Sequence, residues 1–277
     1  MTAKMLMVQG TSSHAGKSVL AAALCRIFAR RGLRTAPFKS WNMALNSYVT
    51  EDGLEIARSQ GVQAEAAGVK AVGDMNPFLL KPSGDGKIQY IVRGRVCECI
   101  PKDFRQYALP VIEESLTALR QDYDVIVIEG AGSPAEINLR SGDVANMAVA
   151  QLFDTPVLLV TDIDRGGALA AVVGTMDLLP AEERRLVVGS VFNRFRGERS
   201  ILEPGLAVVE EHTKVPVLGV IPYVQDTGID EEDSVSLERR QETSGTTDRA
   251  EALDAFTAIV EANLSLDIIW ESMQTNG

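Results

Sequence analysis

The sequence predicts an α/β fold in which a mainly parallel β-sheet carries helices on both faces. Short runs of aliphatic and β-branched residues alternate along the chain with segments whose apolar residues recur at helical spacing. Only 5% of the residues are aromatic, whereas Ala, Val, Leu and Gly are plentiful, as is typical of aliphatic parallel strands covered by helices. The chain has 277 residues, of which 45% are hydrophobic, so one large domain with a full core is expected.

Six segments are expected as buried strands, and helices are expected between them. The strands are predicted at residues 5–8, 35–39, 124–128, 156–161, 186–193 and 215–221. The helices are predicted at residues 17–31, 58–71, 104–121, 143–153, 167–179 and 203–212. Ligands of parallel sheets collect at the carboxyl ends of the strands. The expected site therefore lies in the polar segments that follow four strands: residues 10–18, 40–53, 129–136 and 162–167.

The end of the chain is expected to add a linker and one helix to a main domain of residues 1–240. Residues 241–248 are polar and flexible in composition, which predicts a linker. Apolar residues recur at helical spacing between residues 253 and 270. We therefore expect residues 249–277 to form a helix that packs back on the same domain.

Charge and cysteine content narrow the expected partners and compartment. A net charge of −11 repels phosphate polymers, so neither nucleic acid nor an anionic membrane surface is an expected partner. No apolar stretch approaches the roughly twenty residues that a membrane helix needs, and the N-terminus runs directly into a strand without a secretory leader. The three cysteines, Cys25, Cys97 and Cys99, offer no disulfide framework. A reducing cytoplasm is the expected setting.

A glycine-bounded loop between the first strand and the first helix predicts a phosphate site, although such a turn can exist without a ligand. In a P-loop, backbone amides surround phosphate oxygens, a lysine neutralises the β and γ phosphates, and a serine hydroxyl ligates magnesium. The loop is one residue longer than the commonest spacing. ATP and Mg²⁺ are the expected cofactors, and the loop residues expected to bind them are Gly10, Thr11, Ser12, Ser13, His14, Ala15, Gly16, Lys17 and Ser18.

Two acidic residues are candidates for the second magnesium ligand. Glu129 directly follows the strand predicted at 124–128, where a neighbouring acid completes a P-loop site, because magnesium prefers hard oxygens. Asp52 is a weaker candidate, since it lies among other acidic residues of a loop. For both residues the alternative interpretation is a solvated acid in a turn.

Other strand ends supply further polar candidates. Lys39 ends the second predicted strand, where its ammonium can reach a γ phosphate or a developing acyl phosphate, or else extend to solvent. Asn193 closes a later strand, where its amide can read a base edge or cap a turn. Arg194 and Arg196 follow it and are candidates either for contacts with a carboxylate-rich substrate or for an ordinary basic turn.

Nine ordered segments between about residues 5 and 240 carry a resemblance to a known family. They are GTSSHAGKS at 10–18, APFKSWNMALNS at 36–47, EIARSQ at 55–60, QAEAA at 63–67, DMNPFLLKP at 74–82, EGAGSPAE at 129–136, DIDRGG at 162–167, NRFRG at 193–197 and PVLGVIP at 216–222. Together they resemble the N-terminal synthetase domain of cobyric acid synthases, in the dethiobiotin synthetase-like group of P-loop amide-forming enzymes. The longer phosphate loop is also found in that group.

The resemblance implies ATP-dependent amidation of peripheral carboxylates on a corrinoid, in cobalamin biosynthesis. The reaction would pass through an acyl phosphate, with ammonia as the nucleophile. Related domains often pair across a two-fold axis, so a homodimer is expected. The resemblance also implies these residue roles: Lys17 and Ser18 hold phosphates and magnesium, Asp52 and Glu129 bind the metal, Lys39 stabilises the transferred phosphate, and Asn193 reads adenine. Lys17 and Lys39 are thus the expected catalytic residues.

The sequence departs from the family after residue 240. Cobyric acid synthases of this type usually continue into a glutaminase domain that uses Cys, His and Glu. Here a linker and a helix are expected, and neither His14 nor His212 has a nucleophile-elbow context. Free ammonia, a separate glutaminase subunit and a changed substrate, as for a dethiobiotin synthetase-like ligase on another acid, therefore stay open.

Two alternatives lie outside amide formation. One is a nucleotide-gated regulatory or partner-binding ATPase of the partition type. Such proteins usually carry a second lysine early in the phosphate loop, and residues 10–15 contain none. The other is a domain that kept ATP binding but lost amidation, and that serves as an assembly or carrier partner.

Overall fold

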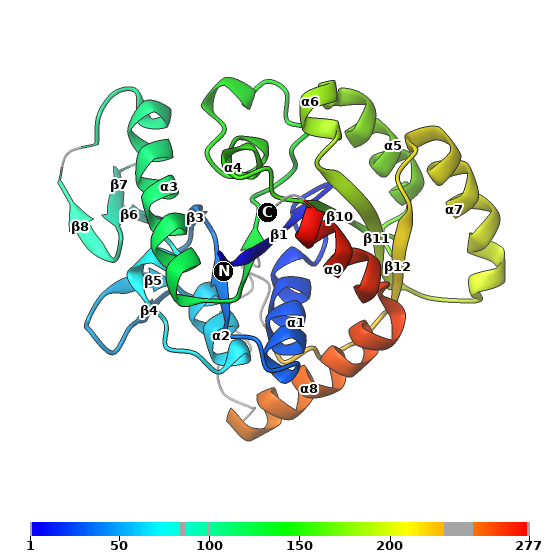
Figure 1. The fold of residues 1–277 in the computed structure, drawn as a ribbon, viewed down its shortest axis with the longest axis horizontal. Coiled ribbons are helices and arrows are strands. Elements are labelled where there is room, and N and C mark those ends of the chain that lie inside the picture. The colour runs from blue at the N-terminus through cyan, green and yellow to red at the C-terminus, as the bar shows by residue number, and fades with distance from the viewer. Residues whose placement is uncertain (1, 84–86, 99, 230–245, 276–277) are drawn as a thin grey trace.

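A six-stranded parallel sheet forms the centre of the computed structural model, which describes residues 2–83, 87–98, 100–229 and 246–275 (Figure 1). The strand order is β12-β11-β10-β1-β9-β2, and every pairing is parallel. The strands are β1 (Lys4–Gly10), β2 (Thr35–Phe38), β9 (Val125–Glu129), β10 (Val157–Asp162), β11 (Val187–Phe195) and β12 (Val217–Pro222). The predicted fold class is confirmed, and each strand overlaps its expected segment.

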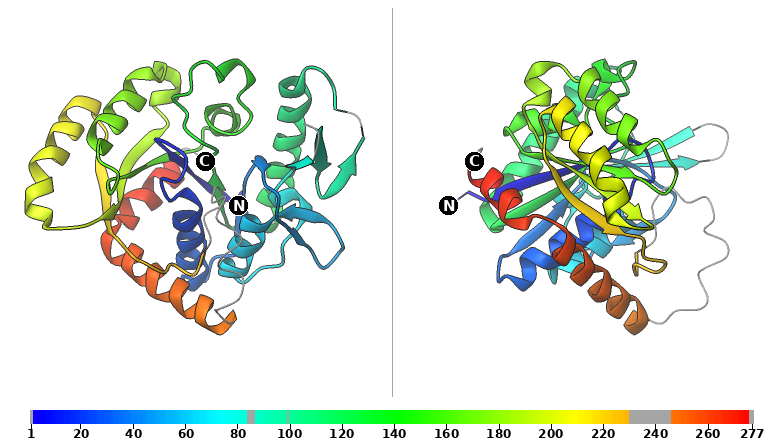
Figure 2. Two further views of the ribbon diagram at one scale, coloured as in Figure 1. Left: turned by 180° about the vertical axis from the view of Figure 1, so that it is seen from behind. Right: turned by 90° about the vertical axis from the view of Figure 1, so that its right-hand side faces the viewer.

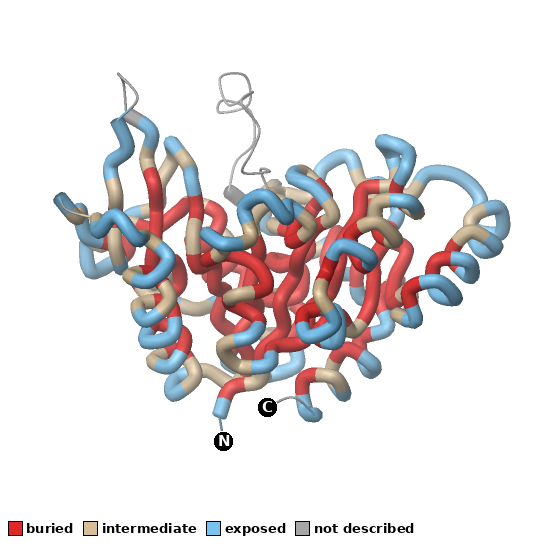
Figure 3. The backbone as a smooth tube through the Cα atoms, turned by 90° about the horizontal axis from the view of Figure 1, so that it is seen from above, coloured by how far each residue is buried: buried red, intermediate tan, exposed pale blue. Residues whose placement is uncertain are grey.

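Helices cover both faces of this sheet, because alternate strand residues point to opposite sides. Met5 and Met7 of β1 belong to a core that also contains buried residues of α3 (Phe104–Asp122), α4 (Met147–Leu152), α5 (Ala168–Leu178) and α7 (Arg199–Thr213). Leu6 and Val8 pack in the second core, with α1 (Lys17–Arg30) and the C-terminal helices. A tube coloured by burial shows the strands as a buried layer between more exposed helices (Figure 3).

Three expected helix boundaries differ from the structure by four residues: α7 begins at Arg199 instead of residue 203, and the other two have local reasons. α4 was expected from residue 143, but the Asp143 carboxylate accepts hydrogen bonds from the backbone N–H groups of Ala145, Asn146 and Ala148. This turn delays the helix to Met147. α2 (Arg58–Ala67) was expected to reach residue 71, but Gly68 has a left-handed φ of 70° and ends the helix.

A smaller set of strands lies beside the β2 edge of the main sheet and was not expected from the sequence. One sheet has the order β3-β6-β7-β8, built from β3 (Trp41–Met43), β6 (Phe78–Ser83), β7 (Lys87–Val92) and β8 (Arg95–Cys97). β4 (Ser47–Val49) and β5 (Glu55–Ala57) form a separate antiparallel pair. The segment 40–53, expected as a polar loop, thus contains two short strands. Of the six strands β3 to β8, four have three residues each, which is too few to show a clear alternation of apolar residues in the sequence.

The end of the chain forms two helices, α8 (Thr246–Asn263) and α9 (Leu266–Thr275), where one helix was expected (Figure 2). The break occurs because the Ser265 N–H donates to the Leu218 carbonyl at 2.8 Å and Leu264 bridges to Gly219 of β12. Phe256, Val260 and Ile269 are buried in the second core. Of the linker expected at 241–248, residues 241–245 lie outside the described residues and 246–248 begin α8.

The described residues also include three short helical elements. They are the short helix α6 (Ala181–Arg184) and the 3₁₀ turns η1 (Gly73–Met75) and η2 (Arg140–Gly142). Within the described ranges, no helix combines the length and the apolar character that crossing a membrane requires.

Candidate active site

The loop between β1 and α1 has the backbone geometry of a phosphate cradle. His14 and Gly16 have left-handed φ values of 59° and 93°, which turn the chain sharply before α1 begins at Lys17. The Lys17 ammonium folds over the loop and donates to the carbonyls of Ser12 at 3.0 Å and Gly132 at 3.1 Å. A lysine ammonium and the first N–H groups of a helix thus lie together, an arrangement that favours an anion.

Residues at the end of β11 hold the outer side of this loop. Asn193 Nδ2 donates to the Ala15 carbonyl at 3.1 Å, and Arg194 Nη1 donates to the His14 carbonyl at 3.0 Å. Arg194 also pairs with buried Asp162 at 2.7 Å. A residue larger than glycine at position 16 would be strained by the left-handed φ of 93°, and its Cβ atom would displace Nδ2 of Asn193 from the Ala15 carbonyl. Two successive loop carbonyls are therefore bound on the side of β11.

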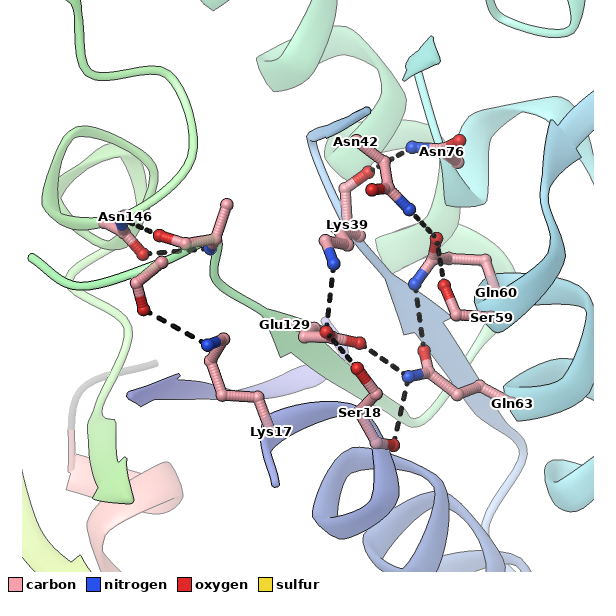
Figure 4. A network of polar contacts seen from close by, with 12 residues as sticks. Lys17, Ser18, Lys39, Asn42, Ser59, Gln60, Gln63, Asn76, Glu129 and Asn146 are labelled. Carbon is pink, nitrogen blue, oxygen red and sulfur yellow. Dashed lines mark hydrogen bonds and ion pairs between the residues drawn. The ribbon is translucent and has the colours of Figure 1, made fainter. Parts of the chain in front are cut away.

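A buried carboxylate at the end of β9 stands next to the loop (Figure 4). Oε1 of Glu129 accepts hydrogen bonds from Ser18 Oγ at 2.7 Å and Lys39 Nζ at 3.0 Å. Oε2 accepts from Gln63 Nε2 at 2.7 Å. The site thus brings together residues from α1, the end of β2, α2 and β9.

These contacts keep Glu129 ionised. Burial by itself raises the pKa of this carboxyl group. The Lys39 ammonium and the hydrogen bonds from Ser18, Gln63 and Lys39 outweigh that effect and hold the pKa below its ordinary value. Glu129 is therefore an anion at neutral pH despite being 1% exposed.

The oxygens of Ser18 and Glu129 fit a magnesium ion that is bound together with a nucleotide. A hydroxyl and an ionised carboxylate are hard ligands, and here they lie 2.7 Å apart beside a phosphate loop. Among the described residues, no group of three or more His, Cys, Asp or Glu side chains is placed to hold a metal. Magnesium commonly takes one or two protein ligands and completes its shell with phosphate oxygens and water.

A cavity of about 540 Å³ opens beside the loop, within the size range of small-molecule sites. Its lining contains Lys17, Lys39 and Glu129, together with other charged residues, namely Glu136, Arg140, Asp143 and Glu183. Aromatic and aliphatic side chains of the lining, called the apolar chamber below, come from Trp41, Met43, Phe104 and Leu139. The cavity therefore combines phosphate-loop residues with an apolar surface.

The structure brings most of the expected site residues together. Lys17, Ser18, Lys39 and Glu129 line the cavity, as do Ser13, His14 and Gly16. The remaining loop residues do not line the cavity: Gly10 and Ala15 are buried, Thr11 is partly buried and Ser12 is exposed. Thr11 Oγ1 donates to Thr161 Oγ1 at 3.0 Å. Asn193 stands behind the loop, and neither Arg194 nor Arg196 lines the cavity. A direct contact of these two arginines with a substrate in this cavity is not supported.

Asp52 is not brought to this site. It lies in an exposed turn between β4 and β5 and does not line the cavity. The turn closes the antiparallel pairing of Ser47 with Ala57, and the neighbouring acid Glu51 pairs with Lys70 at 2.6 Å. The second metal ligand expected at Asp52 is therefore absent from the described cluster around Glu129.

We expect Asp52→Asn to leave Mg²⁺-ATP binding within about twofold of the wild-type affinity, because substitutions of exposed residues change free energies by roughly 0.5 kcal/mol or less. Calorimetry at saturating and limiting Mg²⁺ measures the effect, and Glu51→Gln in the same turn is the matched control. A loss of about tenfold or more in Asp52→Asn alone would show that the hairpin reaches the metal.

Several residues of the site were not expected from the sequence. Gln60 and Gln63 lie on one face of α2, and Asn42 lies in β3. Asn146 holds the segment after β9, because its Nδ2 donates to the Ala131 carbonyl at 2.6 Å and its Oδ1 accepts from the Ala131 N–H. Two glutamines three residues apart in an alanine-rich helix were a usable signal for a polar buried face.

Comparisons with known proteins agree with this geometry. Residues 6–236 match the family described as the CobQ/CobB/MinD/ParA nucleotide binding domain. Cobyric acid synthase of Sorangium cellulosum (strain So ce56) is 58% identical over 87% of this chain and 47% of its own length. Cobyric acid synthase of Geobacillus sp. (strain WCH70) is 54% identical over 84% of this chain and 48% of its own length. That of Desulforudis audaxviator (strain MP104C) is also 54% identical, over 91% of this chain and 52% of its own length. These matches confirm the resemblance inferred from the nine segments.

The chain spans about half the length of the curated relatives it matches. Among solved structures, chloroplast FtsY from Physcomitrella patens is similar with a TM-score of 0.48 and 16% identity, over 91% of this chain and 65% of that chain.

Proposed function

The chain belongs to the CobQ/CobB/MinD/ParA nucleotide-binding domain family, and from this premise we propose that it uses ATP and Mg²⁺ to amidate carboxylates of a corrinoid. The observation that carries the proposal is the convergence of Lys17, Ser18, Lys39 and Glu129 in one cavity whose lining also includes the apolar chamber. The name shared by the relatives, cobyric acid synthase, supports the choice of acceptor.

The phosphate loop supplies the nucleotide half of the site. We propose that the N–H groups at the start of α1 and the Lys17 ammonium bind the β and γ phosphates. Ser18 and Glu129 hold magnesium, which supplies positive charge against the phosphate oxygens when bound. These local groups act against the chain's net charge of −11, which by itself repels a triphosphate.

We propose that Lys39 serves the transfer step. Its ammonium is buried at the cavity wall, 3.0 Å from Glu129 Oε1. We propose that an acceptor carboxylate oxygen attacks the γ phosphorus of ATP, which gives an acyl phosphate and ADP. Ammonia then attacks the acyl carbon, loses a proton, and releases inorganic phosphate to leave the amide. Lys39 stabilises the negative charge on the transferred phosphoryl group, so positioning and charge account for most of the catalysis.

The apolar chamber suits the acceptor. Trp41, Met43, Phe104 and Leu139 can cover the hydrocarbon face of a large ring system, while its peripheral carboxylates approach Lys17 and Lys39 of the same lining. A corrinoid has both a broad apolar face and many carboxylate arms. This match between cavity and ligand chemistry supports a corrinoid over a small linear acid.

The ammonia source, the oligomeric state and the compartment are further parts of the proposal. Free ammonia and ammonia from a separate glutaminase subunit lead to the same chemistry at Lys39. We expect the protein to form a homodimer and to work in a reducing cytoplasm. Buried Cys25 is a free thiol, which is consistent with reducing conditions.

Mass spectrometry of an acceptor panel tests the proposal. We expect the protein with ATP, Mg²⁺ and an ammonium salt to convert a corrinoid polycarboxylic acid to products in which OH is replaced by NH₂, with one ADP released per amide. Omission of ammonium is the control for amide formation, and linear dicarboxylic acids are the control for acceptor class. ATP-driven association of two copies with no amide product would instead support the partition-type alternative.

A further inference from the structure

A row of buried side-chain amides connects the site carboxylate with the cavity wall (Figure 4). Gln63 Nε2 donates to Glu129 Oε2 at 2.7 Å, and Gln60 Nε2 donates to Gln63 Oε1 at 3.3 Å. Asn42 Nδ2 donates to Gln60 Oε1 at 3.4 Å. Asn42 and Glu129 both line the cavity, whereas the two glutamines lie behind it. The row therefore connects Glu129 with Asn42 at the cavity surface, in addition to the direct contact of Glu129 with Lys39.

The ionised carboxylate sets the direction of every hydrogen bond in this row. A carboxylate only accepts, so Gln63 must present its NH₂ group to Glu129 and its carbonyl oxygen to Gln60. Gln60 in turn presents its NH₂ group to Gln63 and accepts from Asn42. Ser59 Oγ also donates to Gln60 Oε1, at 2.9 Å. Each side-chain amide therefore has one orientation that satisfies its neighbours, and flipping any one of them would break the hydrogen bonds on both sides.

Burial makes these contacts costly to break. Gln60 is 0% and Gln63 is 1% exposed, on a helix face that otherwise consists mainly of alanine. Buried amides are unfavourable unless they are hydrogen-bonded, and aliphatic side chains would fill the same space without that requirement. Gln63 Nε2 also lies 3.3 Å from the Ser18 carbonyl, so one amide contacts both protein ligands proposed for magnesium.

We propose that Gln63 is a positioning residue for the magnesium site and that Gln60 couples it to the acceptor chamber through Asn42. Gln63 holds Oε2 of Glu129, and this contact keeps Oε1 directed at the Ser18 hydroxyl. Asn42 is next to the apolar-chamber residues Trp41 and Met43 in β3, so an acceptor that shifts β3 changes the support of Glu129. The role of Gln63 requires only Mg²⁺-nucleotide binding, whereas the coupling through Gln60 rests on the proposed function.

Gln63→Met tests the positioning role. Methionine has nearly the same volume but no N–H donor, and loss of such outer contacts typically weakens metal affinity by roughly 10- to 100-fold. We expect the Mg²⁺ concentration for half-maximal ATP binding to rise by at least about tenfold, with ATP binding in EDTA unchanged. Calorimetry gives both affinities, and Gln121→Met on the exposed surface of α3 is the matched control.

A merely structural role for Gln63 predicts a different pattern. Gln63→Met would then lower the melting temperature and weaken ATP binding equally with and without Mg²⁺, and that outcome would overturn the proposal. Gln63→Asn keeps the amide but shortens its reach, so we expect an intermediate Mg²⁺ requirement if the hydrogen bond is what matters. Should Gln63→Met fail to fold, an unchanged Mg²⁺ requirement in Gln63→Asn overturns the proposal equally.

Gln60→Met tests the coupling. This variant leaves the bond from Gln63 to Glu129 in place and removes the one that leads to Asn42. In the wild type, a saturating corrinoid polycarboxylic acid is expected to change the Mg²⁺ requirement by about fivefold or more, the lower end of typical coupling between sites. In Gln60→Met we expect no change. An equal change in both proteins, or none in the wild type, would overturn the coupling.

The two tests separate this inference from the proposed function. If no corrinoid binds, the proposed acceptor and the coupling are wrong, while the Gln63→Met result on Mg²⁺ and ATP is unaffected. If corrinoid amidation occurs but Gln63→Met keeps the wild-type Mg²⁺ requirement, the proposed function stands and the positioning role is wrong.

Discussion

Lys17→Ala is expected to weaken ATP binding severely and to abolish every activity that depends on bound ATP. The Lys17 ammonium lies over the phosphate loop, between the Ser12 and Gly132 carbonyls, and is 6% exposed. The wild-type chain already has a net charge of −11, and removal of this buried cation makes its repulsion of a triphosphate stronger. Loss of one partner of a buried charge pair costs roughly 3 kcal/mol or more, so ATP affinity should fall by at least about 100-fold.

Calorimetry with Mg²⁺-ATP checks this result, and circular dichroism establishes that the variant is folded. Lys102→Ala removes an exposed lysine before α3 and is the matched control for net charge. Lys17→Arg keeps the charge but changes the shape of the head group, and should bind ATP more tightly than Lys17→Ala. Wild-type affinity in Lys17→Ala would remove the basis of the proposed function.

Glu129→Gln is expected to remove the Mg²⁺ dependence of ATP binding while leaving binding in EDTA intact. The substitution preserves volume but replaces an anionic ligand of a hard cation by a neutral amide. We expect the Mg²⁺ affinity to fall by about 100-fold, as the loss of one protein ligand should cost at least as much as the loss of an outer contact. Binding of metal-free ATP should stay equal or become tighter, since a negative charge near the phosphates is gone.

Stability measurements on the same variant separate ligand loss from damage to the fold. Lys39 pairs with Glu129 in a buried setting, and breaking such a pair from one side costs about 3–5 kcal/mol. Glu129→Gln should therefore lower the free energy of unfolding, measured by urea denaturation. Glu129→Gln combined with Lys39→Met should recover much of that stability without recovering the Mg²⁺ dependence. Full Mg²⁺ dependence in either variant would contradict the assignment of Glu129.

The sequence alone determined the main sheet and the phosphate loop. Buried parallel strands are continuous apolar runs, and each of the six was identified from its own residues. The loop from Gly10 to Ser18 is equally local, since its glycines, its lysine and the helix start all lie within nine residues. Glu129 and Lys39 were located because the carboxyl ends of parallel strands meet at one edge of a sheet. These features depend on short-range patterns and on one general rule of sheet topology.

Tertiary structure alone decided the partners of these residues. Gln63 reaches Glu129 from 66 positions away in the chain, and Asn193 reaches Ala15 from 178 positions away. Asp52 was the weaker of the two acids expected to bind the metal, and the β4–β5 hairpin carries it at the surface. The division of the C-terminal segment into α8 and α9 likewise depends on a contact with β12. Local patterns specify secondary structure, but the energy of these long-range contacts exists only once the chain has folded.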